Sequence, residues 1–220
     1  IAMEVLSRLG VRDFQINLGH MEYFAGVVER IGLNDATLHY LRELIDIKDI
    51  TALTAELKRL KLDARRRDLL LALPHLTGGP EILRKARSLG THSRSRSAIA
   101  HLDHMSRLFS ALGLGKHLTI DLSEVRGLDY YTGIVFRIFV PGLGFEIGGG
   151  GRYDSLFDNF GSPRRAVGFS FSLERLMQCA NLRPMPPATT RSFHLNQKSL
   201  RSQFAQILKA RQSDRKVRLH

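Results

Sequence analysis

A predicted β-hairpin between residues 133 and 148 is the feature that most restricts how this chain can fold. The stretch GIVFRIFV (133–140) is rich in strong β-forming residues, and FEIG (145–148) follows it after the turn-forming residues PGLG. The hairpin runs directly into four glycines, Gly148 to Gly151. Glycines let a ligand approach the backbone closely, because no side chain stands in the way. The sequence therefore predicts two antiparallel strands with an accessible backbone.

Helical spacing dominates the chain before this hairpin. Apolar residues recur at helical intervals through short segments between about residues 35 and 90, and again in a longer segment at 97–115. The other predicted elements are helices at 2–9, 21–33, 152–160, 172–180 and 200–212, and strands at 13–20, 118–122 and 166–171. This order predicts an α+β fold over 1–182 with a helical insertion at about 35–96. Residues 183–220 are predicted to be a linker and a disorder-prone basic tail.

The positive charge is concentrated at the C-terminal end. The formal net charge is +12, and residues 191–220 contain eight basic residues and one acid, a net of +7. The rest of the chain is therefore only mildly basic. A basic terminal segment is typical of a solvated end, so nucleic-acid binding is not favoured, although an RNA-binding module remains an alternative.

The cysteine content and the hydropathy exclude several protein classes. A single cysteine, Cys179, allows no disulfide framework and no zinc site built from several cysteines. No apolar run approaches the roughly 18–20 residues that span a bilayer. These features predict a cytoplasmic protein without a membrane partner.

Two arginine–tyrosine motifs flank the hairpin and are candidate ligand-binding elements. Arg126 and Tyr131 precede the first strand, and Arg152 and Tyr153 follow the glycines. If the two strands pair, both motifs lie near the same end of the hairpin. Tyrosine hydroxyls beside an arginine suit a small polar ligand with a ring and an anionic group. The alternative is a bulged hairpin with ordinary core tyrosines.

Other chemical motifs are weak. The glycine run is followed by no Gly-Lys-Ser/Thr and lies in no strand–helix dinucleotide unit. His101 and His104 share a helix, but without a matching carboxylate or cysteine they predict surface histidines rather than a metal site. Arg175, in a predicted helix, suits either a phosphate contact or a solvated position. We expect no metal and no cofactor.

The segments VRGLDYY, GGGGRYD and AVGFSFSLERL resemble the two histidine-specific motifs and the third class II motif of histidyl-tRNA synthetases. The resemblance covers most of residues 13–182 and implies a class II fold in which an antiparallel sheet forms the floor of the site. It implies that Tyr131 and Tyr153 meet an imidazole. Arg126 matches the arginine that catalyses adenylation, and Arg175 the one that contacts ATP phosphates. The implied histidine-binding residues are Arg126, Tyr130, Tyr131, Gly150 and Tyr153.

Further segments are more similar to regulatory subunits of ATP phosphoribosyltransferase, paralogues of these synthetases that do not charge tRNA. These segments are DFQINLGHMEYFAGVVERIGL, LLLALPHLTGGPEILRKA and VPGLGFEIGGGGRYD. Ser172 replaces the glycine of the third synthetase motif, where a side chain would crowd a nucleotide. Arg137 stands where both groups usually have glutamate. No anticodon-binding domain is recognisable after the closing helix.

The resemblance therefore implies a non-catalytic regulatory subunit that binds histidine and supports feedback inhibition of the first step of histidine biosynthesis. Arg175 would be a vestige of the nucleotide site. The implied partners are a short-form ATP phosphoribosyltransferase catalytic subunit, L-histidine and a second copy of the chain within a hetero-oligomer. The chain resembles an N-terminally truncated copy, so uncovered sheet edges and exposed apolar surface are expected. The alternative is a truncated histidyl-tRNA synthetase.

Overall fold

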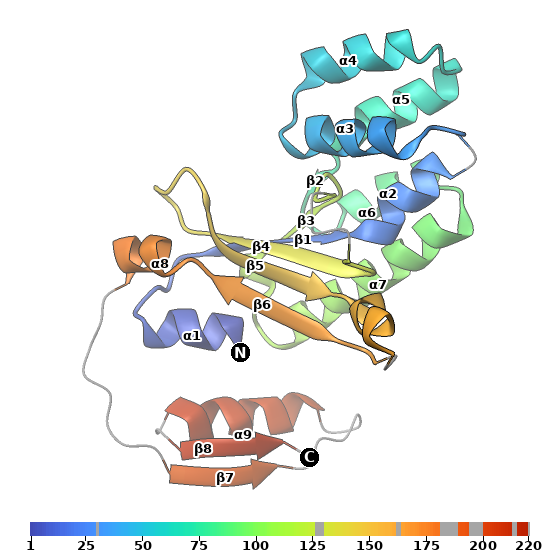
Figure 1. The fold of residues 1–220 in the computed structure, drawn as a ribbon. Coiled ribbons are helices and arrows are strands. Elements are labelled where there is room, and N and C mark those ends of the chain that lie inside the picture. The colour runs from blue at the N-terminus through green and yellow to red at the C-terminus, as the bar shows by residue number, and fades with distance from the viewer. Residues whose placement is uncertain are drawn as a thin grey trace.

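A six-stranded sheet organises the fold, in the strand order β2-β3-β1-β4-β5-β6 (Figure 1). The computed structural model describes residues 1–29, 31–125, 130–161, 164–180, 189–193, 200–212 and 215–219. The strands of this sheet are β1 (Gln15–His20), β2 (Thr77–Gly78), β3 (Leu118–Asp121), β4 (Ile134–Phe139), β5 (Glu146–Arg152) and β6 (Val167–Phe171).

Helices flank the sheet, and most of the chain before β3 is helical. The α-helices that the structure describes between residues 1 and 180 are α1 (Ala2–Arg8), α2 (Met21–Val28), α3 (Asp35–Asp46), α4 (Ile50–Arg59), α5 (Ala64–Ala72), α6 (Ile82–Leu89), α7 (Ser93–Ala111) and α8 (Leu173–Cys179). Short 3₁₀ helices occur at η1 (Leu73–His75), η2 (Gly115–His117) and η3 (Asp154–Phe160). The predicted α+β class is confirmed.

The sheet differs from the expected antiparallel floor in one pair of strands. β1 and β3 run parallel, whereas the other neighbouring strands are antiparallel. The reason is the connection between them: helices α2 to α7 carry the chain across, so that β3 enters the sheet in the same direction as β1. The predicted β4–β5 hairpin is confirmed, with an irregularity in the register between Ile138 and Phe139.

Side-chain caps define where the helices of the insertion begin. Asn34, Asp49 and Asp63 precede α3, α4 and α5, and each accepts a hydrogen bond from a backbone N–H three residues further on, at 2.8–2.9 Å. Such caps satisfy N–H groups that have no partner inside the helix. Each cap therefore helps to fix the start of its helix.

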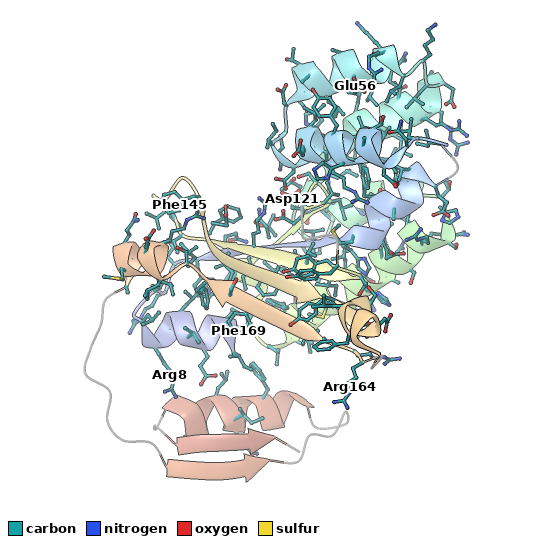
Figure 2. The ribbon with its side chains drawn as sticks, viewed as in Figure 1. Arg8, Glu56, Asp121, Phe145, Arg164 and Phe169 are labelled. Carbon is teal, nitrogen blue, oxygen red and sulfur yellow. The ribbon has the colours of Figure 1, made fainter. Side chains whose placement is uncertain are left out.

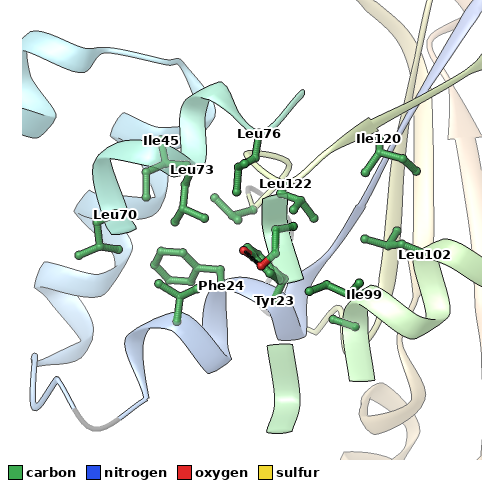
Figure 3. Close-up of a cluster of buried hydrophobic side chains, with 14 of the residues drawn as sticks. Tyr23, Phe24, Ile45, Leu70, Leu73, Leu76, Ile99, Leu102, Ile120 and Leu122 are labelled. Carbon is green, nitrogen blue, oxygen red and sulfur yellow. Dashed lines mark hydrogen bonds between the residues drawn. The ribbon is translucent and has the colours of Figure 1, made fainter. Parts of the chain in front are cut away.

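The main hydrophobic core joins the helical insertion to the sheet (Figure 3). Tyr23 and Phe24 of α2 are almost fully buried, and the Tyr23 hydroxyl donates to the Ala86 carbonyl oxygen at 2.9 Å. Helices α3 to α7 and strand β3 contribute further buried apolar residues. Since the insertion and the sheet share this core, burial of its apolar surface holds both together.

A second core fixes which face of the sheet is covered. Ile16 of β1 and Ile138 of β4 pack with Leu6 of α1 and Leu176 of α8. α7 runs along the same side of the sheet as α1 (Figure 1). The opposite face carries other cross-strand partners, such as Arg137 and Gly149, and is available for a site.

The edge of the sheet at β6 carries exposed apolar side chains. β6 ends the sheet, and Val167 and Phe169 are 74% and 40% exposed. On the adjoining helix α8, Leu173 and Met177 are 71% and 70% exposed. Figure 2 shows Phe169 on this strand.

The C-terminal part of the chain contains more regular structure than the sequence indicated. β7 (Thr189–Phe193) and β8 (Arg215–Leu219) form a parallel pair, with α9 (Leu200–Gln212) between them in the sequence. The helix was predicted, whereas the strands were not, because short strands separated by a helix carry little pairing signal. Through the described ranges, no helix has the length and apolar character to cross a bilayer.

Candidate functional site

The two arginine–tyrosine motifs meet at one end of the β4–β5 hairpin. The backbone N–H of Thr132 donates to the carbonyl oxygen of Arg152 at 2.8 Å, which brings the segments before β4 and after β5 together. The rings of Tyr130 and Tyr131 lie 4.9 Å apart between centroids, and those of Tyr131 and Tyr153 lie 6.2 Å apart. The convergence predicted from the sequence is therefore present. Arg126, the remaining residue of the first motif, lies outside the described residues.

Arg152 fixes the turn rather than pointing freely at a ligand. Its Nε donates to Asp154 Oδ2 at 2.7 Å, and Asp154 Oδ1 accepts from the Ala166 N–H at 3.1 Å. The hydrogen bond from Arg152 lowers the pKa of Asp154. Neighbouring Tyr153 is held by its own backbone N–H, which donates to the Ala166 carbonyl at 2.9 Å.

The glycines of β5 are required by close packing with both neighbouring strands. A Cβ on Gly151 would lie 2.7 Å from the Ile134 carbonyl oxygen and 2.8 Å from the Tyr131 ring. A Cβ on Gly150 would overlap the carbonyl oxygen of Gly168 in β6. The glycine run thus allows Tyr131 to lie directly on the sheet and keeps the strands at their normal spacing.

A cavity of about 430 Å³ lies over the open face of β4, β5 and β6. This volume falls in the range of roughly 300–1,000 Å³ that is usual for small-molecule sites. Tyr131 and Gly150 line it, together with four charged side chains. The charged residues are Glu124, Arg137, Glu146 and Arg175. Two acids and two bases suit a ligand that carries both signs of charge.

Arg175 is held against the start of β5. Its Nη1 donates to Glu146 Oε1 at 2.8 Å and also to the Glu146 carbonyl oxygen. Its guanidinium lies 4.8 Å from the ring centroid of Phe145, which Figure 2 labels near α8. Partial burial opposes ionisation of Glu146, but hydrogen bonds from Arg175 and the backbone, together with the charges of Arg175 and Arg137, outweigh it and lower the pKa of Glu146. The arginine predicted to meet phosphates is therefore already paired with a carboxylate.

Ser172 lines the cavity and also caps α8. Its Oγ accepts from the Arg175 N–H at 3.4 Å, and its own N–H donates to the Ile147 carbonyl oxygen at 2.9 Å. The cap gives this residue a structural role at the position where the synthetase motif has glycine.

The capping role predicts unequal effects of two substitutions at Ser172. Ser172→Ala should lower the free energy of unfolding by about 1 kcal/mol, whereas Ser172→Gly should lower it by only a few tenths, because glycine is itself tolerated at N-caps. Chemical denaturation of both variants measures the difference. Equal losses would show that the hydroxyl does not act as a cap.

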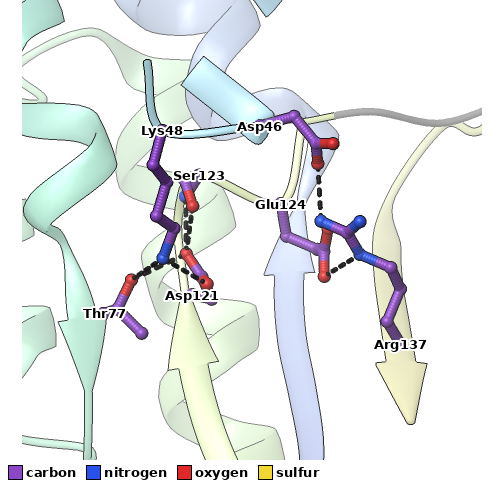
Figure 4. Close-up of polar contacts among 7 residues, drawn as sticks. All are labelled: Asp46, Lys48, Thr77, Asp121, Ser123, Glu124 and Arg137. Carbon is purple, nitrogen blue, oxygen red and sulfur yellow. Dashed lines mark hydrogen bonds and ion pairs between the residues drawn. The ribbon is translucent and has the colours of Figure 1, made fainter. Parts of the chain in front are cut away.

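Arg137, whose role could not be assigned from the sequence, bridges two carboxylates at the cavity wall (Figure 4). Its Nε donates to Glu124 Oε2 at 2.6 Å, and its Nη2 donates to Asp46 Oδ1 at 2.5 Å. Burial raises the pKa of Glu124 to about 7, even though Arg137 acts in the opposite direction. Asp46 ends α3, so this arginine connects the cavity to the helical insertion.

A second polar cluster fixes the turn after α3 on the sheet (Figure 4). Lys48 Nζ donates to Asp121 Oδ2 at 3.0 Å and to Thr77 Oγ1 at 2.9 Å. Asp121 Oδ1 also accepts from the backbone and the hydroxyl of Ser123. These contacts hold the turn, and with it Asp46, beside the cavity.

One of the two predicted surface histidines has a buried partner that the sequence did not indicate. His101 Nδ1 lies 3.2 Å from Nε2 of His20, which is 4% exposed at the end of β1. His20 Nδ1 accepts from the Glu22 N–H, so Nε2 carries the ring proton and donates to His101. Burial, and then His101, lower the pKa of His20 to about 4. Among the described residues, no group of three or more His, Cys, Asp or Glu side chains could hold a metal ion.

Comparison with protein families gives a match over most of the chain. The family model described as Histidyl-tRNA synthetase matches residues 1–176. A curated relative from Geobacter sulfurreducens, named ATP phosphoribosyltransferase regulatory subunit, is 41% identical over 184 residues, which is 84% of this chain. The chain spans only 42% of the length of that relative.

Solved structures agree with the family match. A Bacillus halodurans protein, described as an ATP phosphoribosyltransferase regulatory subunit/histidyl-tRNA synthetase, superposes with a TM-score of 0.75 at 25% identity. The match covers 100% of this chain and 56% of that one. Histidyl-tRNA synthetase from Nostoc sp. PCC 7120 has the same fold, with a TM-score of 0.71 at 21% identity, and the match covers 100% and 55% of the two chains.

Proposed function

Because the chain belongs to the histidyl-tRNA synthetase family, we propose that it acts as a non-catalytic regulatory subunit of ATP phosphoribosyltransferase whose pocket binds histidine. Histidine binding would be coupled to feedback inhibition of a separate catalytic subunit. Such coupling requires that histidine bind two states of the assembly with different affinities. The protein would act in the cytoplasm, as a homodimer within a hetero-oligomer.

The tyrosine cluster supports an aromatic amino acid as the ligand. Tyr130, Tyr131 and Tyr153 gather at the hairpin end, and Tyr131 lies at the cavity wall. A tyrosine hydroxyl, with an ordinary pKa of about 10, is protonated at neutral pH and can donate a hydrogen bond, and burial raises the pKa of Tyr131 further. Histidine offers a flat ring with a nitrogen acceptor for such a donor.

The proposal that the pocket senses histidine rather than activating it rests on the pairing of Arg137 and Arg175, the arginines among the described residues that line the cavity. Arg175 is bonded to Glu146, and Arg137 to Glu124 and Asp46. Synthetases stabilise the ATP phosphates with cationic groups, and an arginine that is neutralised by a carboxylate is a poor phosphate ligand. This charge pattern favours a zwitterionic amino acid over a nucleotide.

The direct test combines the full-length protein with a short-form catalytic subunit. We expect phosphoribosyl transfer by the catalytic subunit to increase in the presence of the regulatory protein, and histidine to inhibit the mixture. Activity and histidine sensitivity that do not depend on the regulatory protein would refute the proposal.

A substitution at Tyr131 tests the pocket itself. Tyr131→Phe should weaken histidine binding about tenfold, because it removes one hydrogen bond of about 1.4 kcal/mol while retaining the ring. Isothermal titration calorimetry measures the affinity. The matched control is Tyr40→Phe in the helical insertion, at a side chain 44% exposed, which should bind histidine as the wild type does. Unchanged affinity in Tyr131→Phe would place the ligand elsewhere.

The family match also supports a second candidate, a histidyl-tRNA synthetase. That protein would activate histidine with ATP and charge tRNA. Histidine-dependent exchange of pyrophosphate into ATP by the full-length protein distinguishes the two functions. Exchange would establish the synthetase and overturn the regulatory proposal.

A further inference from the structure

An irregularity in the β4–β5 register turns the side chain of Glu146 toward the cavity. Ile138 of β4 pairs with Gly148 of β5. The next residue, Phe139, pairs with Glu146, so Ile147 is the extra residue of a bulge. Side chains alternate along a regular strand, and the bulge shifts this alternation by one position. As a result Glu146 lines the cavity, whereas Ile147 is fully buried in the second core.

Glu146 and Arg175 meet at a part of the cavity wall that a ligand can reach. The side chain of Glu146 is 40% exposed and that of Arg175 is 36% exposed. Both bonds of the guanidinium use Nη1, which donates to Oε1 of Glu146 at 2.8 Å and to the carbonyl oxygen of the same residue. Nη2 and Nε of Arg175 form no hydrogen bond with a residue that the structure describes. The arginine therefore retains donors but has lost its uncompensated charge.

The position of the Arg175 guanidinium does not depend on the Glu146 carboxylate alone. The carbonyl oxygen of Glu146 also accepts from Nη1, and the ring centroid of Phe145 lies 4.8 Å from the guanidinium carbon. Both contacts remain when the charge of Glu146 is removed. The guanidinium would then stay at the cavity wall as an uncompensated cation.

We propose that Glu146 is a specificity-determining residue that excludes polyphosphates from the cavity. It neutralises Arg175, and it places a negative charge where a phosphate group would enter. Like charges at close range repel, and arginine is a strong phosphate ligand when its own charge is not compensated. This exclusion does not require histidine binding, so it can be tested separately from the proposed function.

Removing the charge of Glu146 should create a polyphosphate site. Isothermal titration calorimetry of the full-length protein with inorganic tripolyphosphate should show an affinity at least about tenfold higher in Glu146→Gln than in the wild type. Glu174→Gln is the matched control, because Glu174 is exposed beside Arg175 on α8 but does not line the cavity. It changes the formal charge equally and should stay within about twofold of the wild type. Equal gains would overturn the proposal, since the affinity would then follow net charge alone.

A second substitution shows whether the gained site uses Arg175. The double variant Glu146→Gln/Arg175→Gln should bind tripolyphosphate within about twofold of Arg175→Gln alone, because the cation that Glu146 held is absent. A gain that persists in the double variant would refute the proposal. So would a Glu146→Gln protein that keeps the wild-type circular dichroism spectrum and binds tripolyphosphate no more tightly.

The comparison of the wild type with Arg175→Gln does not require Glu146→Gln to fold. Since Arg175 is already neutralised, its loss should change the affinity for tripolyphosphate by less than about twofold. Binding at least about tenfold weaker in Arg175→Gln would overturn the inference, because Arg175 would then accept phosphate despite Glu146. Titration of the wild type with histidine tests the proposed function independently. Histidine binding without a gain in Glu146→Gln refutes only the inference, and a gain without histidine binding refutes only the proposed function.

Discussion

Replacing Gly150 by alanine should lower the free energy of unfolding by about 3 kcal/mol, near the upper end of the usual cost of overpacking. The added Cβ would overlap the carbonyl oxygen of Gly168 and lie 2.6 Å from Cβ of Phe169. Both obstacles belong to β6, and a backbone carbonyl cannot rotate away as the end of a flexible side chain does. β5 and β6 would have to separate. Urea denaturation measures the loss.

Gly144→Ala is the matched control for this substitution. A Cβ at Gly144, in the turn between β4 and β5, would have no atom within 4 Å, and Gly144 is exposed. We expect a change of less than about 0.5 kcal/mol, as for most surface substitutions. Similar losses at the two positions would show that the glycine run is not constrained by close strand packing.

Lowering the pH from 7 to 5 should destabilise the wild-type protein relative to His20→Asn by about 2 kcal/mol. The folded-state pKa of His20 is about 4, below the ordinary value of 6.5. The unfolded chain therefore binds a proton first, so the stability that His20 contributes is present above pH 6.5 and is lost as the pH falls toward 4. Asparagine retains an acceptor for the Glu22 N–H but cannot titrate.

The quantity to measure is the difference in the free energy of unfolding between the wild type and His20→Asn, because other groups titrate in the same pH range. The ionisable groups that act on His20 are Glu22, Arg152 and His101. Glu124 works in the opposite direction: its raised pKa of about 7 adds stability as the pH falls toward 4.5. His104→Asn, at an exposed position on α7, is the control and should follow the wild-type curve. A His20→Asn curve parallel to the wild type would contradict the prediction.

The site was only partly readable from the sequence. Tyr131, Tyr153 and the glycines could be identified because they lie in short motifs beside a predicted hairpin, and a hairpin brings its two ends together. Arg137 could be singled out but not explained. Its partners Asp46 and Glu124 lie 91 and 13 residues away along the chain. No periodicity relates residues at such separations, so the cluster appears only when α3 packs beside the sheet.

The sequence by itself determined the α+β class, the β4–β5 hairpin and the positions of most helices. Hydrophobic period, turn residues and caps are local properties, and local properties fix local structure. Only the tertiary structure decided that β1 and β3 run parallel, that His20 meets His101, and that Arg137 and Arg175 at the cavity are paired with acids. These features depend on packing between distant segments, where burial selects the partners and sets the charge of the pocket.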